Sequence, residues 1–415
     1  MNSERETLLK KAQTAMDACW PELAAHVTRF LGGGGQGYVV AIETNGHPEA
    51  VKLLDMSFYE SPSQRRDAAR RARDELNYHR QMSQRTFGVA KCYDTAEYIP
   101  QSEKGAAPEC RKSLFLIRME LLNPVMIPGP LTMRRKAREM FALHLAADVL
   151  RTVAIFEKAE LIHKDIKISN VLARSQDGRI HYVVSDLGLT RPSSEKQRYI
   201  SQCGSADYRA PEIIAGTKLI GARSDVYSTG VMLFKTMAAD EEELYDPLLF
   251  SKDRSSYEFS EDIKDLILLC TAQDPRRRLS PTEALTETQK RLFLRDKNAE
   301  REVVYALQQQ LCCGPADAHL LDALPETPAA ALLLAADALA ENDERKAIAQ
   351  LSRPAADGSP AAQYYLARLL WHKDQKRANA LLSAAAQNGF EPAVQVLAGR
   401  VPHSAPEALK TVLGL

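Results

Sequence analysis

Residues 163–170 read His-Lys-Asp-Ile-Lys-Ile-Ser-Asn. The chain becomes mainly helical from about residue 138, so this segment is expected to form a loop after a helix. It carries a carboxylate at Asp165, a lysine two residues later and an amide at Asn170. A carboxylate can orient a hydroxyl nucleophile, an amide oxygen can hold Mg²⁺, and a lysine can neutralise a phosphoryl group in transfer. The segment therefore suits phosphoryl transfer.

A second carboxylate follows a predicted strand. Asp186 lies 21 residues after Asp165, in Ser-Asp-Leu-Gly at residues 185–188, just beyond the strand predicted at residues 181–184. A carboxylate at the end of a strand is a natural ligand for a hard divalent cation. Asn170 and Asp186 are therefore the candidate Mg²⁺ ligands.

Five glycines occur between residues 32 and 37, in a turn predicted between two strands. The spacing Gly32-x-Gly34-x-x-Gly37-x-Val39 leaves backbone N–H groups free of side chains, so that they can approach the phosphates of a nucleotide. The alternative is an ordinary mobile loop, which uses glycine for its backbone freedom alone.

A lysine and a glutamate follow this turn. Lys52 lies 15 residues after Gly37, in the short apolar strand predicted at residues 50–54. An ammonium group buried there would need an anionic partner. Glu75, on the polar, arginine-rich helix predicted at residues 63–84, is the candidate partner. The alternatives are an edge-strand lysine in solvent and a glutamate on a solvated helix face.

Taken in order, these motifs resemble those of a eukaryotic-type protein kinase over roughly residues 25–290. The resemblance implies an α+β, two-lobed protein-kinase fold, with an N-lobe at about 25–122 and a C-lobe at about 123–290. It also implies ATP and Mg²⁺ as cofactors and a protein as substrate. Before this domain, apolar residues at helical spacing predict a helical extension over residues 1–24, with the pattern reaching about residue 30.

The resemblance gives each matching residue an expected role. Asp165 would be the catalytic carboxylate and Lys167 the lysine at the γ-phosphate. Asn170 and Asp186 would bind Mg²⁺. The nucleotide-binding positions would be the glycine turn, the ion-paired lysine and glutamate, and the hinge that holds the adenine: Gly32, Gly34, Gly37, Val39, Lys52, Glu75, Glu120 and Leu122.

The resemblance continues beyond these motifs. Residues 210–212, Ala-Pro-Glu, would end the activation segment that begins at Asp186. Glu212 would pair with Arg278, and Asp225 would brace the catalytic loop. Each of these expectations concerns contacts between residues that are far apart in the sequence.

Three positions depart from the family's usual pattern. Gln36 stands where an aromatic residue is usual at the tip of the glycine turn, and Leu187 stands in place of the usual phenylalanine after Asp186. Lys164 replaces the arginine that grips a phosphorylated activation loop, and lysine lacks the bidentate fork of arginine. We therefore expect activity that does not depend strictly on phosphorylation of this loop.

The substrate class follows from finer features of the same resemblance. Lys167 and Ser205 are typical of serine/threonine kinases, so we expect a serine/threonine protein kinase. Two alternatives stay open. One is a pseudokinase-type scaffold that binds ATP, and the other is a kinase-fold enzyme that carries out another nucleotide transfer.

The last third of the chain is rich in alanine and leucine and repeats with a period of 31 residues. Such a period predicts stacked helix pairs, and an alanine-rich bundle with coincidental spacing is the alternative. Residues 326–415 resemble Sel1-like (TPR-like) repeats, an all-α helical solenoid, after a helical linker at 291–325. Such a domain implies recruitment of a protein partner or autoregulation. The spacing recurs in the pairs Ala347 and Ala378, Leu351 and Leu382, and Gly358 and Gly389.

The composition argues against several other functions. Lysine plus arginine and aspartate plus glutamate both total 54, and this balance disfavours nucleic acid or an anionic membrane as the main partner. The longest apolar run, residues 329–336, is far shorter than the roughly 20 residues that span a bilayer. The charged start of the sequence predicts no secretory signal, and seven cysteines without a C-x-x-C pair predict no zinc site. We expect a cytoplasmic protein.

Overall fold

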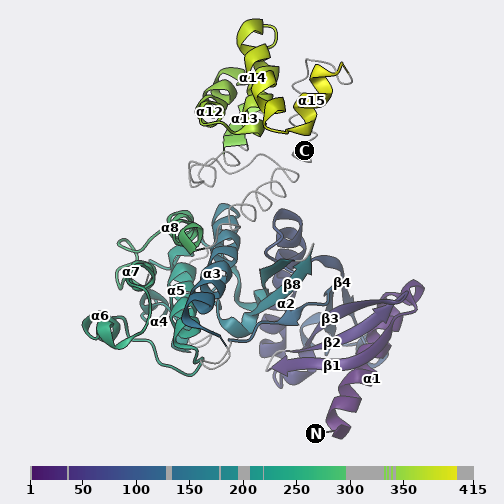
Figure 1. Cartoon of the computed structure of the whole chain (residues 1–415). Helices are drawn as coiled ribbons and strands as arrows, with labels where there is room; N and C mark the ends of the chain where they lie inside the picture. Colours follow the sequence, from purple (N-terminus) through teal and green to yellow (C-terminus); the bar gives the residue numbers. More distant parts are fainter. Residues whose placement is uncertain are drawn as a thin grey trace. The chain divides into compact units, whose positions relative to one another are not determined.

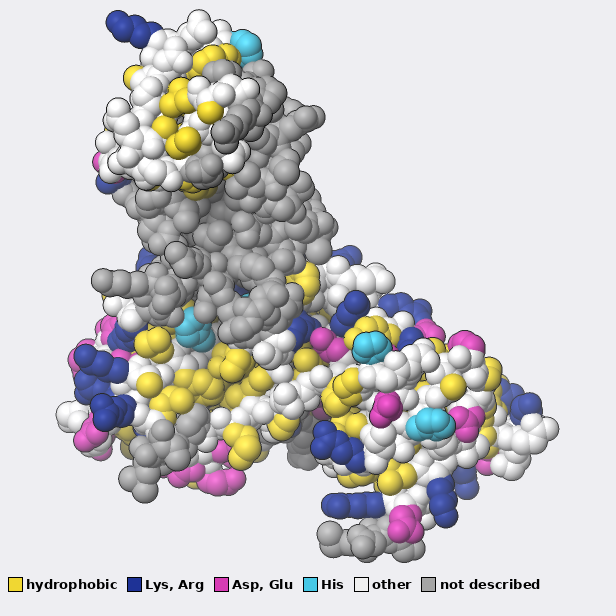
Figure 2. Space-filling view, turned by 45° about the vertical axis from the view of Figure 1, so that its right-hand side comes forward, with side chains coloured by type: hydrophobic (Ala, Val, Ile, Leu, Met, Phe, Trp, Pro, Cys, Tyr) yellow, Lys and Arg dark blue, Asp and Glu magenta, His cyan; other side chains and the backbone are white. Residues whose placement is uncertain are grey.

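The structure is a computed structural model of the whole chain. It contains two compact units, Met1–Leu285 and Thr286–Leu415, which are described separately below. Positively and negatively charged side chains are mixed on the surface: Figure 2 shows lysines and arginines interspersed with acidic residues on the visible face. The residues that the structure describes are 2–34, 37–127, 133–176, 179–194, 206–217, 219–295, 331–332, 334–335, 338–339 and 343–399.

The first unit opens with an antiparallel sheet of five strands in the order β1-β2-β3-β5-β4 (Figure 1). β2 and β3 are joined by a two-residue turn in which Asn45 and Gly46 have φ values of 52° and 78°, the backbone that tight hairpins require. β3 pairs with β2 on one side and with β5 on the other, so it lies inside the sheet. The strands are β1 (His26–Gly34), β2 (Gly37–Thr44), β3 (His47–Asp55), β4 (Cys92–Tyr98) and β5 (Leu114–Glu120).

Each face of this sheet packs against one helix. Because side chains alternate along a strand, Val51 and Leu53 of β3 lie on one face, in a core shared with α1 (Asn2–Cys19). Leu54 lies on the other face and packs against α2 (Pro62–Arg85). α2 begins with a capping box. The Ser61 hydroxyl accepts from the backbone N–H of Gln64, and the Gln64 side chain accepts from the backbone N–H of Ser61.

The second lobe of this unit is mainly helical. α3 (Arg135–Lys158) and α5 (Ala222–Ala238) pack against each other (Figure 1). They share a buried core that includes Val149 and Val153 from α3 and Val231 from α5. The remaining strands and α-helices of this lobe are β6 (Asn123–Pro124), β7 (Leu161–Ile162), β8 (Val171–Gln176), β9 (Arg179–Val184), β10 (Arg191–Pro192), α4 (Pro211–Ile214), α6 (Pro247–Lys252) and α7 (Glu261–Cys270). α8 (Pro281–Arg295) begins in this unit and ends in the second.

Four helices of the second unit follow the predicted 31-residue spacing. They are α12 (Glu344–Ala356), α13 (Pro360–Leu370), α14 (Gln375–Gln387) and α15 (Glu391–Leu397), so α12 and α14 begin 31 residues apart, as do α13 and α15. The aspartates before α12 and α14 cap these helices in the same way. Gly358 and Gly389 both have positive φ, at 92° and 75°. The spacing therefore corresponds to two successive helix pairs, while their assignment to Sel1-like repeats stays a prediction.

One prediction about secondary structure was wrong. The helical pattern was expected to reach about residue 30, but α1 ends at Cys19 and β1 begins at His26. Pro21 opens a short 3-10 turn, Pro21–Leu23, and Ala24 after it has a φ of 45°, so the helix cannot continue. The segment 291–325 was expected to be a helical linker. α8 covers its first five residues, and the rest lies outside the described residues.

Among the described residues, no helix combines the length and the apolar character needed to cross a membrane.

One buried ion pair stabilises the helical lobe. Arg278 donates to Glu212 through two bonds, Nη1 to Oε1 at 2.6 Å and Nη2 to Oε2 at 3.0 Å. The two side chains are 0% and 2% exposed. This is the pairing that the sequence predicted between the end of the activation segment and an arginine near residue 278.

Candidate active site

The loop between β7 and β8 holds the predicted catalytic carboxylate. Oδ2 of Asp165 accepts a hydrogen bond from Nδ2 of Asn170 at 2.8 Å. Nζ of Lys167 lies 2.9 Å from the same oxygen. The two neighbours predicted from the sequence therefore both contact Asp165, and they hold its carboxylate in one orientation.

A buried carboxylate braces the backbone of this loop. Asp225, at the start of α5, accepts from the backbone N–H groups of His163 and Lys164, each at 2.8 Å. Lys164 has a φ of 69°, an uncommon value for a residue with a side chain. Two hydrogen bonds to a fully buried carboxylate can hold such a conformation. This is the bracing role that the sequence predicted for Asp225.

His163 serves the loop as a packing residue. Its ring lies against Phe156, with 5.9 Å between ring centroids, and Nε2 is 3.2 Å from the backbone oxygen of Ser185. Ser185 in turn donates from its backbone N–H to the backbone oxygen of Asn170 at 2.8 Å. These contacts bring the segment with Asp186 beside the loop with Asn170, as the two predicted Mg²⁺ ligands require.

Lys52 joins three elements of the unit. Its Nζ lies 2.5 Å from Oε1 of Glu75 on α2 and 2.7 Å from Oδ1 of Asp186 after β9. Since β3 lies inside the sheet, the alternative of a solvated edge-strand lysine does not hold. Glu75 is 3% exposed, so it is also no member of a solvated helix face.

The electrostatics of this triad keep Lys52 and Asp186 charged. Burial acts to lower the pKa of Lys52, but the carboxylates of Glu75 and Asp186 outweigh it and raise the pKa above its ordinary value. The Lys52 ammonium lowers the pKa of Asp186 to about 2. Burial raises the pKa of Glu75, and the adjacent ammonium opposes that shift. Lys52 is therefore a positive charge that stays positive throughout the physiological pH range.

The glycines of the predicted phosphate loop have two different roles in the structure. A Cβ on Gly37 would lie 2.1 Å from the backbone oxygen of Leu53, so the β2–β3 pairing requires glycine there. A Cβ on Gly32 or on Gly34 would meet nothing within 4 Å. The pairing of the strands thus explains Gly37, whereas Gly32 and Gly34 have room for a side chain. Both lie in β1, opposite Val39 and Gly37 of β2, and not in the turn that the sequence predicted. Val39, also predicted at this site, lies in β2 directly opposite Lys52.

The predicted hinge connects the two lobes through Glu120. Its carboxylate forms an ion pair with Arg174 of β8 and accepts from the backbone N–H of Lys91 at 2.8 Å. Its own backbone N–H donates to the backbone oxygen of Lys91 at 3.0 Å. Leu122, two residues on, is half-buried. Sequence reasoning missed the contact with Arg174, because the two residues are 54 positions apart and share no motif.

Leu187 occupies the place of the usual phenylalanine in a fully packed position. It is 1% exposed and lies in one apolar cluster with Met82 of α2, Phe156 of α3 and Leu161 of β7. Gln36 lies outside the described residues, as does Ser205. The expectation of activity without loop phosphorylation, drawn from Lys164, stays a prediction.

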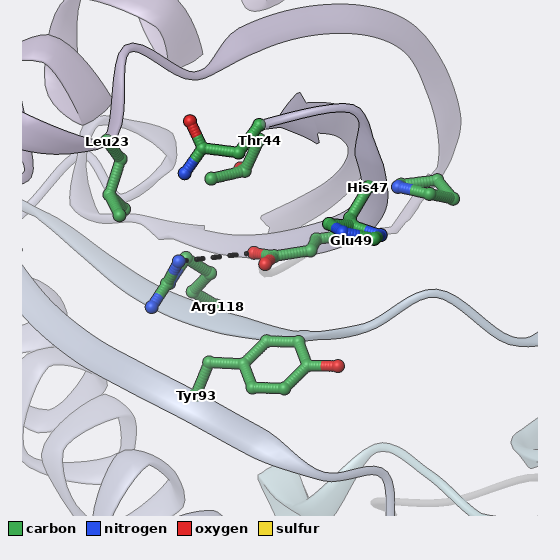
Figure 3. Close-up of a pocket in the computed structure, with 8 residues that line it drawn as sticks. Leu23, Thr44, His47, Glu49, Tyr93 and Arg118 are labelled. Atoms are coloured by element: carbon green, nitrogen blue, oxygen red, sulfur yellow. Dashed lines mark hydrogen bonds and ion pairs between the residues drawn. The ribbon is translucent and has the colours of Figure 1, made fainter.

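A pocket of about 520 Å³ lies away from these residues. Glu49 and Arg118 line it and pair with each other at 3.3 Å, and Tyr93 lies beside them (Figure 3). Glu49 is three residues from Lys52 on the same strand, so the two side chains lie on opposite faces of the sheet. The pocket contains none of the predicted site residues.

A histidine one turn after Glu75 makes the stability of this lobe depend on pH. His79 is 5% exposed, and its Nε2 is 2.8 Å from the backbone oxygen of Ala90. Burial lowers the pKa of His79 to about 4, whereas a histidine in an unfolded chain titrates near 6.5. At pH values between about 4 and about 6.5, the unfolded chain therefore carries a proton on this histidine that the folded chain does not.

We predict that the free energy of unfolding falls as the pH drops from about 6.5 to about 4, by up to about 1.4 kcal/mol per pH unit from this group. The variant His79→Gln cannot titrate and should lose less stability over the same window. Urea denaturation at pH 6.5 and 4.5 measures the difference. His26→Gln, at an exposed histidine, is the control and should keep the wild-type slope, whereas a wild-type slope in His79→Gln would contradict the prediction.

Comparison with known proteins agrees with this geometry. The protein kinase domain family matches residues 25–288. Three relatives come from Saccharomyces cerevisiae. The serine/threonine-protein kinase GIN4 is 29% identical over 211 residues, or 46% of this chain. The probable serine/threonine-protein kinases KCC4 and HSL1 are 28% identical over 194 residues and 26% identical over 184, each 43% of this chain.

Each of these alignments covers less than half of this chain. The chain spans 18% of the length of GIN4, 18% of KCC4 and 12% of HSL1. The family match, by contrast, covers well over half of this chain and includes every residue predicted above for the catalytic loop and the nucleotide site. The chain belongs to the protein kinase family.

Proposed function

We propose that the chain is a serine/threonine protein kinase that transfers the γ-phosphoryl group of ATP to hydroxyl groups of proteins. The contact of Lys52 with both Glu75 and Asp186 carries this proposal. It joins β3, α2 and the end of β9 in one charged cluster. The three relatives, which are named as serine/threonine-protein kinases, support the serine/threonine class.

In the proposed reaction, Asp165 orients the substrate hydroxyl and accepts its proton at a carboxylate oxygen. Asn170 and Lys167 both contact Oδ2 of this residue, so they fix the direction from which the hydroxyl approaches. Lys167 also places a positive charge where negative charge develops on the phosphoryl group. Asp225 keeps the loop in this conformation.

The donor set fits a nucleotide with a divalent cation. Nδ2 of Asn170 is bound to Asp165, which leaves its amide oxygen for a cation, and the Asp186 side chain is 47% exposed. One amide and one carboxylate do not complete the shell of Mg²⁺, so phosphate oxygens would have to supply further ligands. ATP with Mg²⁺ would supply the transferable group and neutralise its charge. Lys52 would then hold the α- and β-phosphates, and the backbone at Gly32 and Gly34 would cover them.

Two other functions remain as alternatives. A pseudokinase-type scaffold would bind ATP and transfer nothing, and a kinase-fold enzyme could transfer another part of the nucleotide. The intact set of Lys52, Glu75, Asp165, Asn170 and Asp186 favours phosphoryl transfer over a scaffold. The ordered pairing of Asp165 with Lys167 favours a hydroxyl acceptor.

We predict that the full chain transfers labelled γ-phosphate from ATP–Mg²⁺ to itself and to a generic basic protein. Asp165→Ala should lower the rate by about 10²–10⁴-fold, the usual contribution of a positioned acid–base group. Lys104→Ala, an exposed lysine outside the site, is the matched control and should keep the wild-type rate.

Phosphoamino-acid analysis of the labelled protein should give phosphoserine or phosphothreonine. No label together with thermal stabilisation by ATP would point to the scaffold. Label from the α-phosphate or the adenosine moiety would point to another nucleotide transfer.

We further propose that residues 326–415 form Sel1-like repeats that recruit a protein partner. The 31-residue recurrence of α12–α13 in α14–α15 supports this assignment, because stacked helix pairs create extended binding surfaces. Autoinhibition of the kinase domain is the alternative role.

We predict that removing the residues after about position 300 leaves the turnover of a generic basic protein unchanged. The rates of the full and shortened chains, measured at equal concentration and well below their melting temperatures, test this. Increased turnover in the shortened chain would contradict recruitment as the role of the repeats and indicate inhibition instead.

A further inference from the structure

We propose that Lys11, in the helix that precedes the matched kinase domain, is a positioning residue for the Lys52–Glu75 pair. It would act through Asp55, a buried carboxylate at the junction between β3 and α2. The inference rests on the kinase activity proposed above. It adds a residue that lies outside the matched span 25–288.

α1 is built into the sheet lobe. Ala12, Ala15 and Met16 are at most 1% exposed and share a core with the strands. The side chain of Gln13 donates to the backbone oxygen of Ala25 at 2.9 Å and accepts from the backbone N–H of Val27 at 2.8 Å. The helix therefore has a fixed place against the start of β1, and its side chains can reach the sheet at defined points.

Because α1 is fixed against the sheet, Lys11 contacts Asp55. Its Nζ lies 2.5 Å from Oδ2 of Asp55 and 2.9 Å from the hydroxyl of Ser57. The Asp55 side chain is 0% exposed, whereas that of Lys11 is 31% exposed. The second oxygen of Asp55 accepts from the backbone N–H and the hydroxyl of Ser57, at 2.9 Å and 2.6 Å. Lys11 thus supplies the positive charge opposite a carboxylate that has no access to water.

Asp55 lies where the two elements of the catalytic pair meet. It is the last residue of β3, three residues after Lys52. It also caps the short 3-10 helix Met56–Phe58, which leads into α2 and so to Glu75. The direction in which the chain leaves β3 therefore sets where α2 begins, and with it the distance between Glu75 and Lys52.

Loss of Lys11 would act on this junction first. A buried carboxylate that loses its cation is strongly unfavourable unless it moves toward water. Movement of Asp55 toward solvent would turn the chain between β3 and α2, and Glu75 would withdraw from Lys52. Small displacements of a catalytic group lower the rate of a reaction steeply. The expected effect is therefore on turnover, more than on affinity for the protein substrate.

The test compares Lys11→Met with two matched variants in the full chain. We expect kcat of Lys11→Met to fall about tenfold, within the range that a displaced catalytic group produces, with KM for the protein substrate unchanged. Lys10→Met removes an exposed lysine from the adjacent position and should keep the wild-type kcat. Gln13→Ala removes two contacts of α1 that do not involve Asp55, so it should lower the melting temperature without lowering kcat.

Two further variants test the route through Asp55. Lys11→Arg keeps the charge and should restore most of the rate. In an Asp55→Asn background the buried charge is gone, so Lys11→Met should cost little additional kcat.

The inference is overturned if Lys11→Met keeps the wild-type kcat. It is also overturned if kcat falls equally in Gln13→Ala and Lys11→Met at equal loss of melting temperature, because that would show a structural role alone. An inactive wild-type chain would instead contradict the proposed kinase activity, so the two failures are distinguishable.

Discussion

The ion pair between Lys52 and Glu75 is the contact on which the arrangement of the sheet lobe depends. It joins an inner strand to the helix packed on one face of the sheet, and it continues to Asp186 in the other lobe. Burying these charges is favourable only because each is paired at close range. The pair can form only if β3 and α2 leave their junction in one direction. Lys11 and Asp55 lie at that junction, on the opposite side of the sheet from Glu75.

The helical lobe uses buried charges for the same purpose, to hold backbone in a conformation that it would not adopt alone. Asp225 accepts from the consecutive backbone N–H groups of His163 and Lys164 in the loop that holds Asp165, and Lys164 has a positive φ. Glu212 and Arg278 fix the start of α4 in a site with almost no solvent exposure. Each of these acids is expensive to bury and is compensated by directed hydrogen bonds. These hydrogen bonds therefore hold the backbone of the loop with Asp165 in the conformation described above.

The sequence predicted which residues of the candidate site contact each other better than it predicted their other contacts. Asp165, Asn170 and Asp186 stand in short motifs whose spacing is local, and Lys52 was recognisable as a lysine in an apolar strand. The contacts of Glu120 with Arg174 and of Lys11 with Asp55 join residues 54 and 44 positions apart. Nothing in a single sequence marks such pairs, because burial and pairing are set by the packed fold. The prediction that the first helix reaches about residue 30 was wrong because apolar spacing over a few residues does not distinguish a helix from a strand.

The rate of γ-phosphoryl transfer in Glu75→Gln tests the central claim most directly. The substitution keeps the size of the side chain and removes the charge opposite Lys52. If the pair organises the site for catalysis, the rate should fall by about a hundredfold, while Glu97→Gln, at a surface carboxylate paired with Arg73, should keep the wild-type rate. A Glu75→Gln chain that transfers phosphate as fast as the wild type would contradict the claim.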